Sequence, residues 1–132
     1  MNKTYLIIAA ALGAISVMLG AFGAHGLQRI TNDETIIRSY QTAVQYEMYH
    51  ALALLLVAFI FYRLKLSLIR WSGNFFITGI LLFSGSLYAI TALKINGSVV
   101  PGFIGILTPI GGVFFILGWL LLLIAALRNL PE

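Results

Sequence analysis

The chain has 132 residues, of which 61% are hydrophobic and 9% are charged, with 8 basic and 4 acidic residues and no cysteine. Ordinary soluble domains carry roughly 25% charged residues, and a domain of this size buries only about two-thirds of the surface of its unfolded chain. This composition excludes a soluble enzyme, a disordered tail and a nucleic-acid-binding module, and it indicates an integral membrane protein. The lack of cysteine also excludes disulfides and thiolate metal sites.

The first predicted span covers residues 5–24, which carry no charge and follow Lys3. Twenty apolar residues are enough to cross a bilayer, and they exceed the roughly 7–15 residues of a signal-peptide core. We therefore expect an uncleaved transmembrane helix.

A polar stretch follows, and the second helix is predicted to start at Asn32 and Asp33, which are good N-cap residues, with Glu34 in its first turn. The hydrophobic pattern continues to Tyr62. A helix of this length measures roughly 45 Å, which exceeds the thickness of the hydrocarbon core. Its first two turns are therefore expected at the interface, and its span at about residues 42–62.

The third span is predicted at residues 71–93, with Trp71 as an interfacial aromatic residue. The uncharged stretch 95–127 is too long for one span, and glycine, asparagine and proline residues mark its first part as a loop. Thr108 is predicted to cap the last helix and Pro109 to be its first residue, because proline lacks the N–H that is unpaired there anyway. The fourth span is then 109–127. Gly111 and Gly112 are expected to lie against the third helix near residues 84–88.

Four spans predict an all-α membrane protein, a four-helix antiparallel transmembrane bundle that forms a single domain over residues 1–132. Both termini then lie on one side of the membrane. That side carries five basic residues, Lys3, Arg63, Lys65, Arg70 and Arg128. The other side carries three, Arg29, Arg38 and Lys94. The positive-inside rule therefore predicts cytoplasmic termini.

Polar side chains within and beside the spans are expected at similar depths, in the outer half of the membrane. At about 1.5 Å per residue, His50 lies roughly 20 Å from Arg63, and Ser84 roughly 21 Å from Arg70. We therefore predict that His50 is buried and bonded to Ser84 or Ser86. The candidate binding residues are His25, Gln41, Gln45, Tyr46, Glu47, His50, Ser84, Ser86, Tyr88 and Thr108.

Two interpretations of these residues stay open, namely hydrogen bonds that only hold the helices together, or a site for a lipid headgroup, small solute or ion. Glu47 and His50 have the spacing of a di-metal element, but such a site needs further carboxylates that the spans lack. We therefore predict no metal site and no cofactor. The sequence has no His-Glu-x-x-His, Gly-x-Ser-x-Gly or phosphate-loop motif, so no catalytic residue is predicted and the chain is not expected to be an enzyme.

Four motifs occur in a fixed order, namely GAFGAHGL at 20–27, QTA at 41–43 followed by Tyr46 and His50, FSGSLY at 83–88, and TPIGG at 108–112. Together they resemble the YgdD/YwdK-like family of small multi-pass membrane proteins of unknown function. Glu47 lies outside these motifs. The resemblance implies a multi-pass location in the bacterial cytoplasmic membrane and supplies no activity.

The sequence therefore predicts a binding or structural role centred on the polar cluster in the outer leaflet. The alternative is a small transporter or channel for a solute, ion or lipid, in which several copies of the chain assemble and Glu47 is the intramembrane ionisable group. Membrane lipids are the expected partners, nucleic acid is not, and the identity of a small-molecule ligand stays open.

Overall fold

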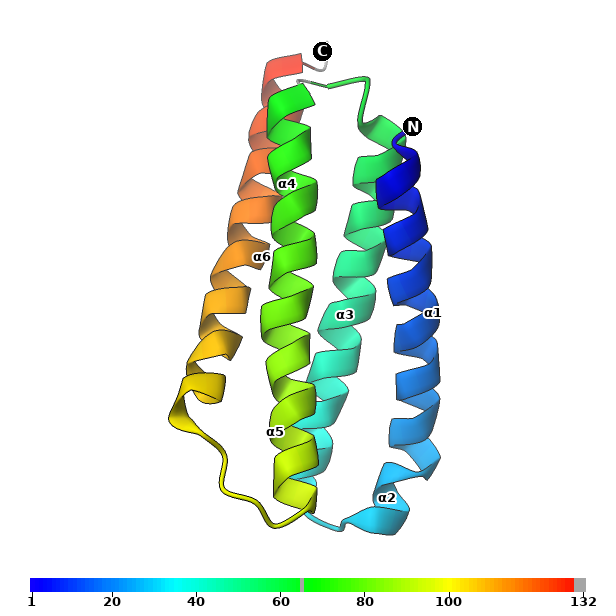
Figure 1. Cartoon of the computed structure of the whole chain (residues 1–132). Coiled ribbons are helices and arrows are strands. Elements are labelled where there is room, and N and C mark those ends of the chain that lie inside the picture. Colours follow the sequence, from blue (N-terminus) through cyan, green and yellow to red (C-terminus); the bar gives the residue numbers. More distant parts are fainter. Residues whose placement is uncertain (65, 130–132) are drawn as a thin grey trace.

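The computed structural model describes residues 1–64 and 66–129, which form helices and no strands (Figure 1). Lys65, one of the basic residues counted above, and residues 130–132 lie outside the described residues. The helices are α1 (Lys3–His25), α2 (Leu27–Ile30), α3 (Glu34–Ile60), α4 (Leu66–Gly79), the π-helical turn η1 (Ile80–Ser84), α5 (Gly85–Ile95) and α6 (Gly102–Asn129).

Four of these stretches are long and apolar enough to cross a membrane. They are Lys3–Ile30, Glu34–Ile60, Ser67–Ile95 and Gly102–Arg128, where α4, η1 and α5 together form the third. Neighbouring helices run antiparallel, so the start of α1 and the end of α6 lie at the same end (Figure 1). The predicted four-helix antiparallel transmembrane bundle is confirmed.

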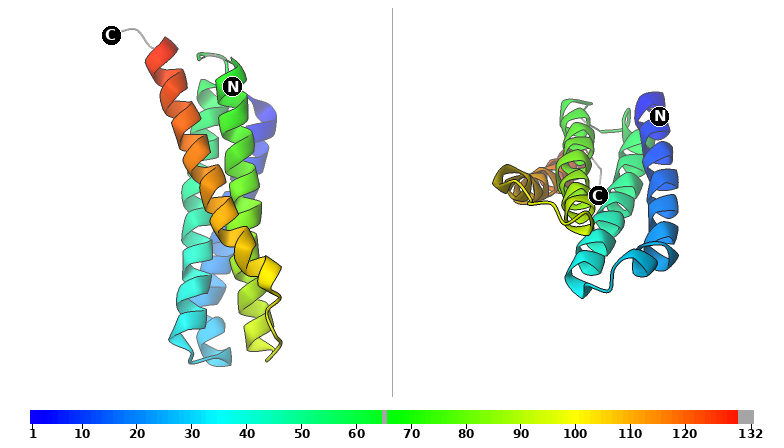
Figure 2. Two further views of the ribbon diagram at one scale, coloured as in Figure 1. Left: turned by 90° about the vertical axis from the view of Figure 1, so that its left-hand side faces the viewer. Right: turned by 60° about the horizontal axis from the view of Figure 1, so that its bottom comes forward.

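The four long helices are arranged nearly in a row (Figure 2). The main contacts of α1 are with α3, those of α6 are with the third helix, and α3 packs against the third helix. Because α1 and α6 are the outer members, each buries little of its surface, and in α1 only Tyr5, Ala9, Ser16 and Gly23 are buried. This open arrangement leaves grooves between helices that face the lipid.

The start of α3 is set by Asp33, as predicted. Its Oδ1 accepts hydrogen bonds from the backbone N–H groups of Thr35, at 2.8 Å, and Ile36, at 3.4 Å. These two hydrogen bonds hold the pKa of Asp33 below its ordinary value, because they stabilise the charged carboxylate.

The cap predicts a pH dependence of stability. Because the pKa of Asp33 is lower in the folded state, its contribution is fully present above the ordinary pKa and is lost as the pH falls through the folded-state value. We expect Asp33→Asn, which keeps the oxygen acceptor without titrating, to show a smaller drop in melting temperature between about pH 5 and pH 2. Thermal unfolding in detergent measures this, and equal drops in both proteins would show that Asp33 does not contribute.

The π-helical turn η1 widens the middle of the third span. The N–H of Gly85 donates to the carbonyl of Ile80, five residues earlier, and the Ser84 hydroxyl donates to the Ala43 carbonyl of α3 at 2.7 Å. Such single π turns occur mostly inside α-helices and frequently at functional sites. Phe83, within this turn, borders a groove of about 700 Å³ between α3 and α6.

The predicted start of the fourth helix at Pro109 is wrong, because α6 begins at Gly102 and Pro109 lies inside it. Pro109 has no N–H to donate to the carbonyl of Gly105, and its ring presses on that turn. Thr108 does not cap the helix, because its hydroxyl bonds to Ser86 of α5.

Candidate functional site

His50 is buried between α3 and α6, with 5% of its surface exposed. Its Nδ1 lies 2.7 Å from the Tyr46 carbonyl oxygen, and the Trp119 Nε1–H donates to its Nε2 at 3.2 Å. A carbonyl oxygen only accepts hydrogen bonds, so Nδ1 carries the proton and Nε2 is the acceptor. The hydrogen bonds thus assign a neutral imidazole in one tautomer. The predicted burial of His50 is confirmed, but its partner is in α6 and not in the third helix.

Ser84 and Ser86 are unavailable to His50 because each bonds elsewhere. Ser84 donates to the carbonyl of Ala43. The Ser86 hydroxyl donates to its own helix at the Phe83 carbonyl, at 2.9 Å, so the Thr108 hydroxyl, 2.6 Å away, donates to Ser86. These bonds connect the third helix to α3 and to α6, which agrees with the structural interpretation of these residues.

Aromatic rings surround His50 and form the wall of a groove between α3 and α6. The His50 ring is stacked on Phe115, with centroids 3.5 Å apart and planes 6° apart. Tyr46 is stacked on Phe83 at 4.7 Å, and Phe76 meets Trp119 edge-on at 5.2 Å. The groove has a volume of about 700 Å³. It is lined by Tyr46, Tyr49, His50, Phe83, Pro109, Gly112, Val113, Phe115, Ile116 and Trp119.

The polar groups available in this aromatic groove are two phenols. Tyr46 and Tyr49 are exposed, and within the described part of the chain no hydrogen bond is found for either hydroxyl. His50 and Trp119 are already bonded to each other. The groove can therefore accept a mainly apolar molecule and form hydrogen bonds with it through the hydroxyls of Tyr46 and Tyr49.

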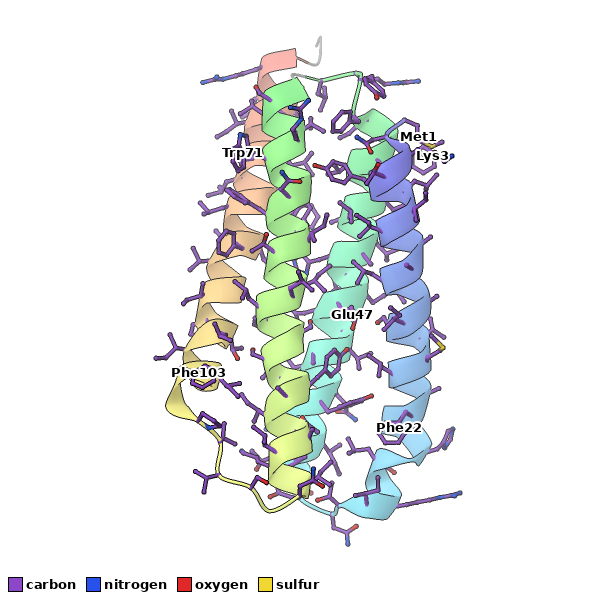
Figure 3. All side chains as sticks on the ribbon, viewed as in Figure 1. Met1, Lys3, Phe22, Glu47, Trp71 and Phe103 are labelled. Carbon is purple, nitrogen blue, oxygen red and sulfur yellow. The ribbon has the colours of Figure 1, made fainter. Side chains whose placement is uncertain are left out.

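Glu47 is buried on another side of α3, with 3% of its surface exposed. The Tyr88 hydroxyl donates to its Oε2 at 2.5 Å, and the Tyr88 ring meets Tyr40 edge-on at 5.5 Å. Tyr40 in turn donates to the Leu19 carbonyl of α1 at 2.7 Å. Glu47 is thirteen residues from Glu34 and thirteen from Ile60 (47 − 34 and 60 − 47), so it lies midway along α3 (Figure 3). Among residues 1–64 and 66–129, no basic side chain forms an ion pair with it.

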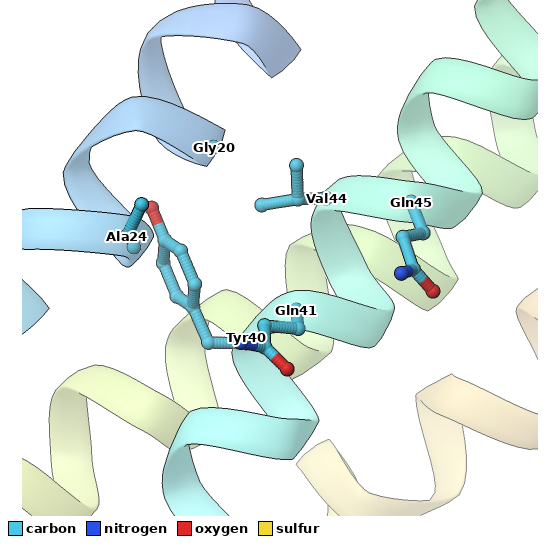
Figure 4. A pocket seen from close by; sticks show the side chains of 7 residues that line it. Gly20, Ala24, Tyr40, Gln41, Val44 and Gln45 are labelled. Carbon is cyan, nitrogen blue, oxygen red and sulfur yellow. The ribbon is translucent and has the colours of Figure 1, made fainter. Parts of the chain in front are cut away.

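The remaining predicted residues lie apart from both places. Gln41 and Gln45 are exposed and line a smaller cavity of about 320 Å³ between α1 and α3, next to Gly20 and Tyr40 (Figure 4). His25 is exposed at the end of α1. The predicted single polar cluster is therefore divided into an aromatic groove, a buried carboxyl and a shallow amide-lined cavity. No group of three metal-ligating side chains occurs in the described ranges.

Phe83, Phe115 and Trp119 were not predicted as site residues. Aromatic residues in apolar stretches are ordinarily core or lipid-facing, and the sequence has no local signal for their stacking. One indication was available in the sequence. The indole N–H of Trp119 needs a hydrogen-bond acceptor in a nonpolar environment, which favours a polar residue of another helix as its neighbour.

Comparison with known proteins places the chain among membrane proteins of unknown function. The family model described as "Protein of unknown function (DUF423)" matches residues 19–112. The chain is 40% identical to the UPF0382 membrane protein YwdK of Bacillus subtilis, over 97% of this chain and 99% of that protein. It is 40% identical to the UPF0382 inner membrane protein YgdD of Escherichia coli, over 96% and 92%, and 39% identical to a UPF0382 membrane protein of Schizosaccharomyces pombe, over 89% and 96%. No solved structure matches the chain.

Proposed function

This chain belongs to the DUF423 family of membrane proteins, and we propose that it binds a membrane-dissolved amphiphile in the aromatic groove between α3 and α6. The observation that carries the proposal is the cavity of about 700 Å³ walled by stacked rings around a buried, neutral His50. Its volume falls within the roughly 300–1,000 Å³ of small-molecule sites, which are typically apolar with few polar groups.

The lining defines the chemistry of the ligand. Stacked rings such as Tyr46 and Phe83 present flat apolar faces, which suit a planar or unsaturated ligand. The phenol of Tyr49 can bond to one polar substituent. Because the groove lies between two spanning helices, such a molecule would enter sideways from the bilayer. We propose binding and not catalysis, because the sequence offers no nucleophile motif and no paired carboxylates.

Filling the groove tests the binding function. A Cβ at Gly112 would be 3.9 Å from the nearest neighbouring atom, a ring carbon of Phe83, so Gly112→Leu should fold while projecting into the groove. Gly13→Leu is the matched control, because no neighbouring atom lies within 4 Å of its Cβ and it is far from the groove. Native mass spectrometry should detect a small-molecule adduct on the wild-type and Gly13→Leu proteins and none on Gly112→Leu. The same adduct pattern on all three proteins would contradict the proposal.

Transport is a second candidate function, favoured by Glu47. A carboxyl midway along a spanning helix is costly in lipid and is by default a functional hypothesis. Four spanning helices are few to enclose a path by themselves, so this function also requires several copies of the chain to assemble. Proton flux into liposomes, followed with an enclosed pH-sensitive dye, should be present for the wild-type protein and absent for Glu47→Gln. Equal flux in both would leave no role for Glu47 in transport.

We also propose that both termini are cytoplasmic, in the cytoplasmic membrane of a bacterium. The end with the start of α1 and the end of α6 carries four of the described basic residues, Lys3, Arg63, Arg70 and Arg128, and the other end carries Arg29, Arg38 and Lys94. Reporter fusions after residue 132 and within residues 28–35 should report opposite sides, the first cytoplasmic. An external C-terminal reporter would reverse the assignment.

A further inference from the structure

A second cavity lies at the end of the bundle where α1 starts, α3 ends and α4 starts (Figure 1). It has a volume of about 400 Å³ and, unlike the aromatic groove, it is lined by polar groups, among them Asn2, Thr4, Tyr62, Arg70 and Asn74. We propose that this headgroup pocket binds the phosphate of an anionic phospholipid.

Tyr5 fixes the wall of the headgroup pocket. Its ring is 6% exposed, and its hydroxyl lies 2.9 Å from the Arg70 carbonyl oxygen and 2.7 Å from the Asn74 Oδ1. Gly73 makes this approach possible, because a Cβ there would come within 2.8 Å of the Tyr5 ring. The first turn of α1 is therefore joined to α4 between Arg70 and Asn74, beside the pocket.

The hydrogen bonds inside the wall leave donors for a ligand. The Asn2 Oδ1 accepts from the Tyr5 N–H, so that amide oxygen is already in use. The Asn2 NH₂ group remains, together with the Arg70 guanidinium, which forms no ion pair within residues 1–64 and 66–129. A guanidinium with neutral N–H donors is the donor set that binds phosphate oxygens.

The charge at this end is complementary to an anion. Of the described acidic residues, Asp33 and Glu34 begin α3 at the opposite end and Glu47 lies midway along it, whereas Lys3, Arg63 and Arg128 surround the headgroup pocket end. Basic residues at a membrane surface attract anionic headgroups.

A lipid fits the headgroup pocket better than a soluble phosphate does, because the pocket borders an apolar groove. Asn74 lines both the pocket and a groove of about 460 Å³ that contains Trp71, Phe75 and Phe114. Trp71 is 56% exposed and comes directly after Arg70, where interfacial aromatic residues occur. A phosphate at Arg70 would thus have a path for its acyl chain between α4 and α6.

The test compares an anionic lipid with a zwitterionic one, and Arg70 variants with an Arg29 variant. Detergent-purified protein is titrated with phosphatidylglycerol or phosphatidylcholine, and bound lipid is quantified by native mass spectrometry. We expect phosphatidylglycerol to bind the wild-type protein at least about tenfold more tightly, the factor of one charge-assisted hydrogen bond. Arg70→Gln should abolish this preference and Arg70→Lys should reduce it. Arg29→Gln, at the other end of the bundle, is the matched control and should keep it.

Two results would overturn the proposal. Equal losses in Arg70→Gln and Arg29→Gln would mean that diffuse charge, and not the headgroup pocket, attracts the lipid. A rise in melting temperature with soluble glycerol phosphate, present in the wild-type protein and absent in Arg70→Gln, would assign the pocket to a water-soluble phosphate compound. All variants change exposed side chains, so circular dichroism should confirm an unchanged fold.

Discussion

Replacing Gly111 by alanine should destabilise the bundle by about 2–3 kcal/mol. A Cβ at Gly111 would collide with the backbone nitrogen of Phe83 and come within 2.8 Å of its Cα. Backbone atoms cannot rotate away as a side chain can, so α6 would have to move away from the third helix. In lipid the hydrophobic effect does not drive helices together, so their association depends on close packing at small residues such as glycine. Thermal unfolding in detergent measures the loss.

The neighbouring glycine provides the control. Gly112→Ala places its Cβ 3.9 Å from a Phe83 ring carbon, an ordinary contact. Alanine also favours the helix by about 0.5–1 kcal/mol relative to glycine, so this variant should be as stable as wild type or slightly more stable. Equal destabilisation by both substitutions would mean that α6 does not approach the third helix at Gly111.

Replacing His50 by leucine should cost about 1–3 kcal/mol, because it leaves the Trp119 Nε1–H without an acceptor in lipid, which offers none, and removes the stacking on Phe115. His50→Gln should cost less, since its amide oxygen can accept from Trp119. The melting temperatures of both variants test this order.

A double-mutant cycle isolates the hydrogen bond. In a Trp119→Phe background no N–H is left unpaired, so His50→Leu should cost less there than in the wild-type protein. If the cost is the same in both backgrounds, the bond between His50 and Trp119 contributes nothing to stability.

Much of the fold could be predicted from the sequence because hydrophobic length and helix capping are local properties. Residues 5–24 were long enough to span, and Asp33 could cap α3 whatever surrounded it. The start of α6 could not be predicted in this way. Pro109 fits both a helix start and a helix interior, and only the folded chain shows that helical residues precede it from Gly102.

The site was predictable only in part. Polarity in an apolar stretch indicated that His50 is buried, and it is. Its partner depends on how the helices pack. Matching depths suggested Ser84 for His50, but the π-helical turn and the position of α6 bring Trp119 to His50 and direct Ser84 to the Ala43 carbonyl. The aromatic groove arises from the same packing, which brings Tyr46, Phe83 and Pro109 together from three separate motifs.

The π-helical turn connects this packing to the proposed function. It places Phe83 beside Tyr46 at the aromatic groove while the next residue, Ser84, bonds to α3. The same turn carries the close approach to Gly111, so the groove and the contact between α6 and the third helix depend on one feature of the backbone.

Photo-crosslinking in native membranes tests the binding function most directly. A photoreactive residue at Ile116 lies in the aromatic groove, and one at the neighbouring Leu117 lies on the exposed surface of α6 outside it. We predict a single small-molecule adduct at position 116, lost in the Gly112→Leu protein, and the mixture of bulk phospholipids at position 117. The same phospholipid mixture at both positions would show that the groove holds only ordinary lipid and would contradict a ligand-binding function.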